Sequence, residues 1–171
     1  MIRPCPNGPT ARLALLLALS LLSMLPLPAA ALVETSQIGK LLQAGAKLDA
    51  RDRFGRTALI LAVRHDQPDV VRALVAAGAA LDARDQFGRS PLILAASAGA
   101  AELVTELAAA GAQLDLVDGM GRTALIWAAR HGHGATVAAL VAAGADASLR
   151  DHFGDTALTA AIPRVWAAST P

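Results

Sequence analysis

The sequence predicts an all-α solenoid, in which units of two short helices stack side by side and polar hairpins project from them. Three observations lead to this fold class. Glycines recur with a period of 33 residues in two independent sets, hydroxyl and leucine positions keep the same period, and aromatic residues make up only 3% of a chain that is 54% hydrophobic. A fixed period of this length is the mark of repeat architectures. The two glycine sets are Gly55, Gly88, Gly121 and Gly154, and Gly45, Gly78, Gly111 and Gly144.

The first helix of each unit is predicted from its starting residue. A hydroxyl side chain can accept a hydrogen bond from the first free amides of a helix, and a proline is tolerated at the first helical position. Pro91 occupies such a position. A short apolar segment follows and ends near Gly99 or Gly132. The starting hydroxyls are Thr57, Ser90, Thr123 and Thr156.

A second helix is indicated by apolar residues at intervals of three and four, such as Val70, Val71 and Leu74. The glycines at 78, 111 and 144 are expected to end these helices in a left-handed conformation. The stretch that follows is rich in Asp and Gly, which is typical of a projecting hairpin. Its periodic aspartates are expected to accept backbone N–H bonds within the hairpin: Asp52, Asp85, Asp118 and Asp151.

Stacking follows from the same residues. One unit of two short helices cannot cover its own apolar faces, whereas neighbouring units can cover each other. Alanines at Ala62, Ala95 and Ala128 allow neighbouring helices to approach closely. The core is therefore expected to consist of alanine and leucine with few aromatic rings.

Residues 1–31 are interpreted as a secretory signal peptide that is cleaved. Arg3 and Arg12 precede a 13-residue apolar run at 13–25, Pro26 ends the run, and alanines occupy 29–31. An uncleaved membrane anchor is the alternative, but the run is shorter than the ~20 residues that a membrane-spanning helix needs. The predicted location is therefore the periplasm or the exterior of the cell, with no membrane attachment after cleavage.

Cleavage changes the charge and the cysteine content. Lys+Arg falls from 15 to 13 with Arg3 and Arg12, against 14 Asp+Glu, so the net charge moves from +1 to −1. This balance does not indicate nucleic-acid binding. The single cysteine, Cys5, leaves with the leader, which excludes disulfide and thiol chemistry from the mature chain.

The period of 33, with the segments TALILAV, SPLILAA and TALIWAA, resembles the ankyrin repeat over about residues 36–162. The resemblance implies a domain at 32–163 and a protein-binding function carried by the hairpin tips and the exposed ends of the first helices. The chain departs from the family in placing apolar residues where a histidine is usual, so apolar packing is expected to hold the seams. The replacing residues are Ile60, Ile93 and Ile126, with Thr159 in the last copy.

Full repeats are expected at 51–83, 84–116 and 117–149. Partial repeats are expected at 34–50 and 150–163, followed by a tail at 164–171. Polar capping helices, which solenoids normally carry, are not evident at either end. Apolar faces are therefore expected to be exposed at the ends, and they favour fraying or a homo-oligomer formed through the ends.

Catalysis is not predicted. The chain contains no GxSxG, no phosphate loop ending in GK[ST] and no HExxH motif. His65 and His131 stand two repeats apart, roughly 20 Å for helices spaced at 8 to 10 Å, which is too far for one metal ion. His133 is interpreted as part of the turn between two helices. No cofactor and no metal are expected.

The predicted partner-binding residues lie at the hairpin tips and the first-helix ends. Phe54, Phe87, Met120 and Phe153 would form an apolar ladder edged by arginines that meet carboxylates on a partner, and aromatic residues, Met and Arg are enriched in interface cores. The alternative is that each ring folds back and stiffens its own hairpin. Trp127 is interpreted as core filling. The full set is Arg53, Phe54, Arg56, Arg64, His65, Gln86, Phe87, Arg89, Met120, Arg122, Arg130, His131, His152 and Phe153.

The function expected from these features is a non-catalytic scaffold that binds another protein outside the cytoplasm. The alternative is a structural envelope component that stacks end to end through its uncapped ends. The two differ in the residues they use, since the first depends on the hairpin tips and the second does not.

Overall fold

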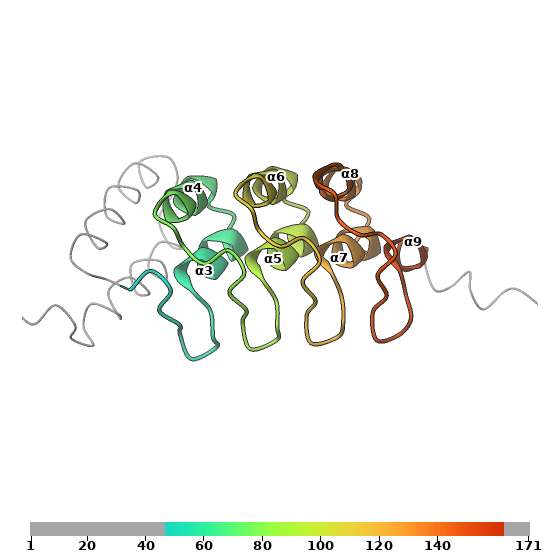
Figure 1. The fold of residues 1–171 in the computed structure, drawn as a ribbon, viewed down its shortest axis with the longest axis horizontal. Coiled ribbons are helices and arrows are strands. Elements are labelled where there is room, and N and C mark those ends of the chain that lie inside the picture. The colour runs from blue at the N-terminus through green and yellow to red at the C-terminus, as the bar shows by residue number, and fades with distance from the viewer. Residues whose placement is uncertain (1–46, 163–171) are drawn as a thin grey trace, which may run out of the picture.

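The structure is a computed structural model, and it describes residues 47–162 as a row of repeated helical units (Figure 1). The first helices of the units are α3 (Ala58–Arg64), α5 (Pro91–Ala98), α7 (Ala124–Arg130) and α9 (Ala157–Ala160). The second helices are α4 (Pro68–Ala76), α6 (Ala101–Ala109) and α8 (Gly134–Ala143). The described residues contain no strand, which confirms the predicted all-α solenoid.

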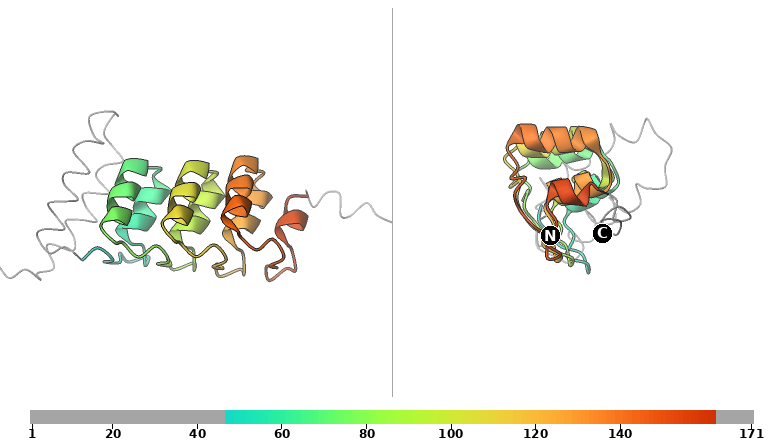
Figure 2. Two further views of the ribbon diagram at one scale, coloured as in Figure 1. Left: turned by 45° about the horizontal axis from the view of Figure 1, so that its top comes forward. Right: turned by 90° about the vertical axis from the view of Figure 1, so that its right-hand side faces the viewer.

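The helices form two layers, and the hairpins project to one side of them (Figure 1). The first helices pack in a row, α3 on α5, α5 on α7 and α7 on α9, while α6 packs on α8 in the second layer. Viewed along the row, the units lie almost behind one another, so the hairpin tips share one edge of the molecule (Figure 2). This arrangement aligns equivalent residues of successive repeats.

The predicted helix starts are confirmed. Each starting hydroxyl accepts the backbone N–H of the residue three positions later, as the cap interaction requires. The four caps are Thr57, Ser90, Thr123 and Thr156. The glycines that follow the second helices also have the expected left-handed conformation, with φ of 83° at Gly78, 93° at Gly111 and 97° at Gly144.

The turn between the two helices of a unit requires a left-handed residue. Gly99 and Gly132 supply it with φ of 77° and 73°, and Asp66 takes the same repeat position with φ of 51°. A side chain makes this conformation unfavourable, although Asp tolerates it better than most residues. The first full repeat therefore has the least favourable of the three turns.

The core lies between the units, as the periodic pattern predicts. Leu59, Leu92 and Leu125 are each 1% exposed, and the alanines at 62, 95 and 128 are fully buried. The isoleucines that replace the usual histidine are also buried. Apolar packing of small side chains and branched chains therefore holds the seams, as expected from the sequence.

The predicted leader, nearly all of the predicted opening partial repeat and the predicted tail lie outside the described residues. The predictions made for them are therefore not tested by the structure. Of the helices within residues 47–162, none has the length and apolar character that crossing a membrane would require.

Candidate partner-binding surface

Each hairpin is organised by one aspartate. One carboxylate oxygen accepts the backbone N–H groups of the residues two and four positions later, at distances of 2.8 to 3.0 Å. This confirms the predicted role of the aspartates, which are Asp52, Asp85, Asp118 and Asp151. Because these bonds close the hairpin from within, the tip has a defined shape before any partner binds.

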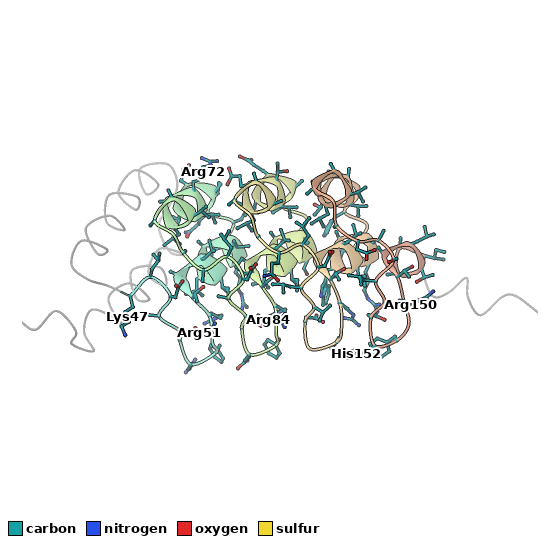
Figure 3. All side chains as sticks on the ribbon, viewed as in Figure 1. Lys47, Arg51, Arg72, Arg84, Arg150 and His152 are labelled. Carbon is teal, nitrogen blue, oxygen red and sulfur yellow. The ribbon has the colours of Figure 1, made fainter. Side chains whose placement is uncertain are left out.

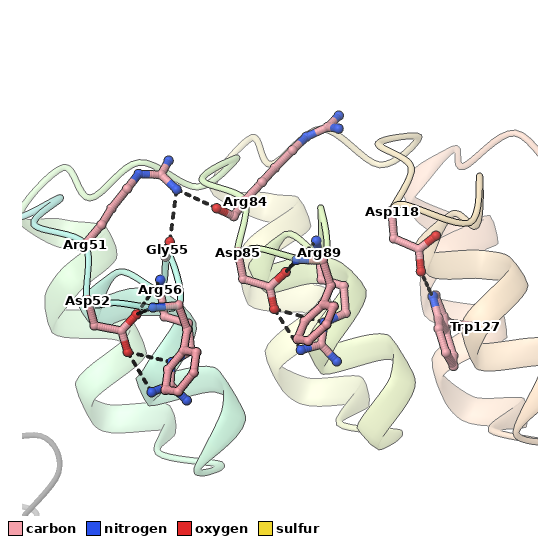
Figure 4. A network of polar contacts seen from close by, with 11 residues as sticks. Arg51, Asp52, Gly55, Arg56, Arg84, Asp85, Arg89, Asp118 and Trp127 are labelled. Atoms are coloured by element: carbon pink, nitrogen blue, oxygen red, sulfur yellow. Dashed lines mark hydrogen bonds and ion pairs between the residues drawn. The ribbon is translucent and has the colours of Figure 1, made fainter.

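The second oxygen of the aspartate binds an arginine in the first two hairpins (Figure 4). Asp52 Oδ2 lies 2.7 Å from Nε and 2.6 Å from Nη2 of Arg56. Asp85 Oδ2 lies 3.0 Å and 2.8 Å from the same two atoms of Arg89. Both arginines are thus paired inside their own hairpins. Their charge is already neutralised at short range, and the expectation that they meet a partner's carboxylates stays a prediction.

The third hairpin uses a different pairing. Asp118 Oδ2 accepts a hydrogen bond of 2.9 Å from Nε1 of Trp127 (Figure 4). Arg122 lies instead toward the next hairpin, with Nε 3.5 Å from Asp151 Oδ2. In the fourth hairpin Asp155 stands at the position that the arginine occupies in the others. Trp127 therefore takes the place of Arg122 at Asp118, and Arg122 pairs with an aspartate of the next repeat.

Two predictions change because of this pairing. Arg122 is 7% exposed, so it does not edge a surface ladder. Trp127 is partly buried against the core, but it is also a hydrogen-bond donor to Asp118, and the guanidinium carbon of Arg122 lies 4.9 Å from its ring centroid. The interpretation of Trp127 as core filling is therefore incomplete.

The apolar side chains at the tips are exposed, as a binding surface requires, and some of them also pack on their own hairpins. Phe87, Met120 and Phe153 are 57%, 50% and 61% exposed. The guanidinium carbon of Arg89 lies 4.8 Å from the Phe87 ring centroid, so one side of that ring stacks on its own hairpin while more than half of the residue remains exposed. Phe54 differs, since it is only partly exposed, with Arg53 and Arg56 within 4.6 and 4.7 Å of its ring centroid.

Neighbouring hairpins are tied together through their backbones. Phe54 O accepts the N–H of Gln86 at 2.9 Å, and Phe87 O accepts the N–H of Gly119 at 2.9 Å. Met120 O accepts the N–H of His152 at 3.0 Å in the same register. The tips therefore form one continuous row.

The ends of the first helices add polar side chains beside this row. Arg64 and His65 end α3, Arg130 and His131 end α7, and all four are exposed. His131 Nδ1 lies 3.0 Å from Trp127 O, and its ring stacks on Trp127 with centroids 5.3 Å apart. Because the partner atom is a carbonyl oxygen, Nδ1 carries the proton.

His133 belongs to the turn between α7 and α8, as predicted. Its Nε2 lies 3.2 Å from Ser97 O of the preceding repeat, which makes it a donor across the seam. Within residues 47–162 no group of three or more His, Cys, Asp or Glu side chains is placed to hold a metal ion.

A second set of periodic aspartates was not predicted to have a role. Asp49, Asp82 and Asp115 each accept an N–H from the following repeat, at 2.9, 3.0 and 3.0 Å. Their spacing of 33 residues was visible in the sequence. They add hydrogen bonds between repeats to those made by the hairpin backbones and by His133.

Among the arginines that were not singled out from the sequence are Arg72 and Arg84. Arg72 on α4 contacts Asp69, Glu102 and Glu106 at 2.8, 3.2 and 2.6 Å, on the helical side of the molecule (Figure 3). Such exposed pairs contribute little to stability. Arg84 is exposed, and its side chain extends away from the hairpin network (Figure 4).

The aspartate of the first hairpin, Asp52, makes the fold sensitive to acid. Burial by itself raises the pKa of Asp52, but hydrogen bonds from Arg56 and Phe54 and the charge of Arg56 outweigh it, so the pKa lies below its ordinary value. The folded state then binds fewer protons than the unfolded state. Its stabilisation is complete above the unfolded pKa of about 3.9 and is lost as the pH falls through the folded pKa.

We therefore expect the free energy of unfolding to decrease as the pH falls below about 4. Asp52→Asn should reduce this decrease, because the asparagine oxygen still accepts the two amides but does not titrate. Urea unfolding of both proteins across this pH range, followed by circular dichroism, measures the effect. Equal pH dependence in the two proteins would contradict the role given to Asp52.

A stacked array of helix pairs with a pre-formed row of hairpin tips defines a repeat-type interaction module. The chain belongs to the ankyrin-repeat family: the family model described as ankyrin repeats (3 copies) matches residues 27–118 and 99–164. Ankyrin repeats generally mediate protein–protein interaction and are typically non-catalytic. No curated protein matches the chain.

Proposed function

We propose that this protein is a non-catalytic scaffold of the periplasm or the cell exterior, which binds a protein partner through its hairpin tips and first-helix ends. The observation that carries the proposal is the row of exposed Phe87, Met120 and Phe153 on hairpins that are bonded to one another. Large apolar side chains held in place before binding lose little entropy in a complex. They are also residue types enriched in the cores of interfaces.

The charges around this row suggest the character of the partner. Arg53, Arg64 and Arg130 are exposed beside the tips, whereas the three other tip arginines are held by aspartates. The proposed partner therefore presents an apolar patch bordered by carboxylates. The location rests on the apolar leader in residues 1–31, and sequencing the amino terminus of the exported protein tests it.

The binding face is tested by replacing Phe87 and Met120 with alanine together. We expect the affinity for the partner captured from an envelope extract to fall by at least about 30-fold, because each side chain is placed as an interface anchor. Binding of the purified partner is measured by calorimetry, and helical circular dichroism should be unchanged. Arg56 and Arg89 are unsuitable positions for this test, since their loss would disrupt the hairpins.

Val141→Ala is the matched control, because Val141 is 54% exposed and lies on α8 away from the tips. It should leave the affinity unchanged. Unaltered binding by the tip variant would show that the partner uses another face.

The alternative function, end-to-end assembly of an envelope component, uses different residues. Its structural support is the exposed apolar surface at α9, where Leu158 is 77% exposed. Assembly of this kind would give a sedimentation coefficient that rises with protein concentration and does not respond to the tip variant. Loss of both partner capture and assembly in the tip variant would contradict that alternative.

A further inference from the structure

The ring of His131, at the end of α7, is held in a stack with two neighbouring rings. Its centroid lies 5.3 Å from that of Trp127, with an angle of 15° between the two planes. The ring of His133 stacks on His131 as well, with centroids 5.8 Å apart and an angle of 9°. Because both contacts are nearly parallel, His131 has one preferred orientation on the surface before any partner binds.

This orientation fixes which nitrogen of His131 is available to a partner. Nδ1 lies 3.0 Å from Trp127 O and donates its proton to that carbonyl oxygen. Nε2 has no hydrogen-bond partner among residues 47–162, and His131 is exposed. A neutral ring therefore presents a lone pair at Nε2. A second proton is added at Nε2, so the bond to Trp127 O remains when the ring becomes charged.

The helices around His131 place basic and apolar residues near it. Arg130 precedes it on the exposed end of α7, and His133 follows in the turn to α8. α7 packs against α5, α8 and α9, and none of these three helices contains a charged residue. The helical elements in contact with α7 therefore offer no carboxylate to a protonated His131.

The carboxylates of the neighbouring hairpins already have partners. Asp118 Oδ2 accepts the N–H of Trp127 Nε1 at 2.9 Å. Asp151 Oδ2 lies 3.5 Å from Nε of Arg122, whose guanidinium carbon is 4.9 Å from the Trp127 ring centroid. The carboxylate that pairs with a charged His131 must therefore come from another molecule.

His65, two repeats earlier, shows which of these features are specific to His131. Both histidines end a first helix with nearly the same backbone conformation, φ −95° and ψ 9° at His65 and φ −92° and ψ 0° at His131. Leu61 stands where Trp127 stands, so it provides no ring for His65 to stack on, and Asp66 follows His65 directly. His65 therefore has an acidic neighbour of its own and lacks the tryptophan that orients His131.

We propose that protonation of His131 strengthens the binding of a partner that carries carboxylates, so that the affinity rises as the pH falls from 8 to 6. The inference rests on the proposed function and adds a regulation of the same surface. Histidine changes its charge in this pH range. The lone pair of neutral Nε2 repels a carboxylate, whereas protonated Nε2 donates a charge-assisted hydrogen bond to it. The complex then holds more protons than the free protein, which is why acid favours binding.

The experiment measures the binding of deca-aspartate, as a carboxylate probe, to the full chain by calorimetry at pH 8 and pH 6 in low salt. The side chains of the probe stay ionised over this range. We expect binding to be about fourfold tighter at pH 6, which is the size of one exposed ion pair. His131→Gln should abolish this increase, because glutamine does not titrate. His131→Arg should bind the probe equally well at both pH values.

His65→Gln is the matched control, and it should keep the increase at pH 6. An increase in His131→Gln as large as that of the unchanged protein would overturn the inference. That result would leave the proposed function standing, since the proposed function is tested by the alanine variant of Phe87 and Met120 at one pH.

A second readout needs no probe. Long-range proton–nitrogen NMR spectra of His131 report which ring nitrogen carries the proton. We expect the proton on Nδ1 at pH 8 and a growing fraction of rings protonated on both nitrogens toward pH 6. A neutral ring with its proton on Nε2 would overturn the inference, because Nδ1 would then be the nitrogen that gains the proton.

Discussion

Replacing Asp85 by alanine is expected to lower the free energy of unfolding by about 3 kcal/mol. Its carboxylate accepts the backbone N–H groups of Phe87 and Arg89, both at 2.9 Å, and pairs with the Arg89 guanidinium at 2.8 and 3.0 Å. The side chain of Asp85 is 1% exposed, so water does not replace these bonds without opening the hairpin. Urea unfolding followed by circular dichroism measures the loss.

Asp85→Asn is the matched control for this prediction. The asparagine oxygen can still accept the two amides, but the charge that binds Arg89 is gone. We expect Asp85→Asn to lower the free energy of unfolding by about 1 kcal/mol, which is the contribution of the ion pair. Similar small losses for both variants would show that the bonds between hairpins, and not the aspartate, hold the second hairpin.

The second large effect is expected at Trp127. Trp127→Leu restores the residue of the two preceding repeats. It should nevertheless lower the free energy of unfolding by about 2 kcal/mol, because it removes a hydrogen bond to a carboxylate and a cation–π contact with Arg122. Arg122 can then return to Asp118, as Arg56 pairs with Asp52. Asp151, whose side chain is 0% exposed, would lose its arginine.

The return of Arg122 to Asp118 would leave Asp151 without an arginine, and a new arginine at position 155 is expected to replace it. Asp155→Arg places an arginine relative to Asp151 as Arg89 stands relative to Asp85, so Trp127→Leu with Asp155→Arg should recover about 1 kcal/mol beyond the sum of the single changes. A double-mutant cycle on the free energy of unfolding measures this coupling. Strictly additive single changes would contradict the exchange of partners between the third and fourth hairpins.

Much of the fold could be predicted because it depends on local interactions and on a repeated pattern. A hydroxyl such as Thr123 caps a helix through an amide three residues away, and an aspartate such as Asp52 binds amides two and four residues away. The residues that form these contacts are close to one another in the sequence. The fixed period then places equivalent apolar residues beside one another, so the seams follow from the same pattern.

The candidate surface was predicted less completely. The exposure of Phe87 and Met120 agrees with their expected place at the tips. Arg56 and Arg89 were predicted to contact a partner, because residue type and position do not reveal that the aspartate four residues earlier binds them. The aspartates Asp49 and Asp82 were missed although their period was visible, since only stacking shows that they reach the next repeat.

By itself the sequence determined the two-helix unit, its period and the apolar faces that make stacking necessary, because these depend on local geometry and on the burial of apolar surface. The tertiary structure alone decided which charges remain at the surface. Trp127 binds Asp118 and Arg122 binds Asp151 of the next repeat. This pairing depends on distances across a seam. These pairs depend on the relative position of neighbouring units, and the sequence of a single repeat does not specify that position.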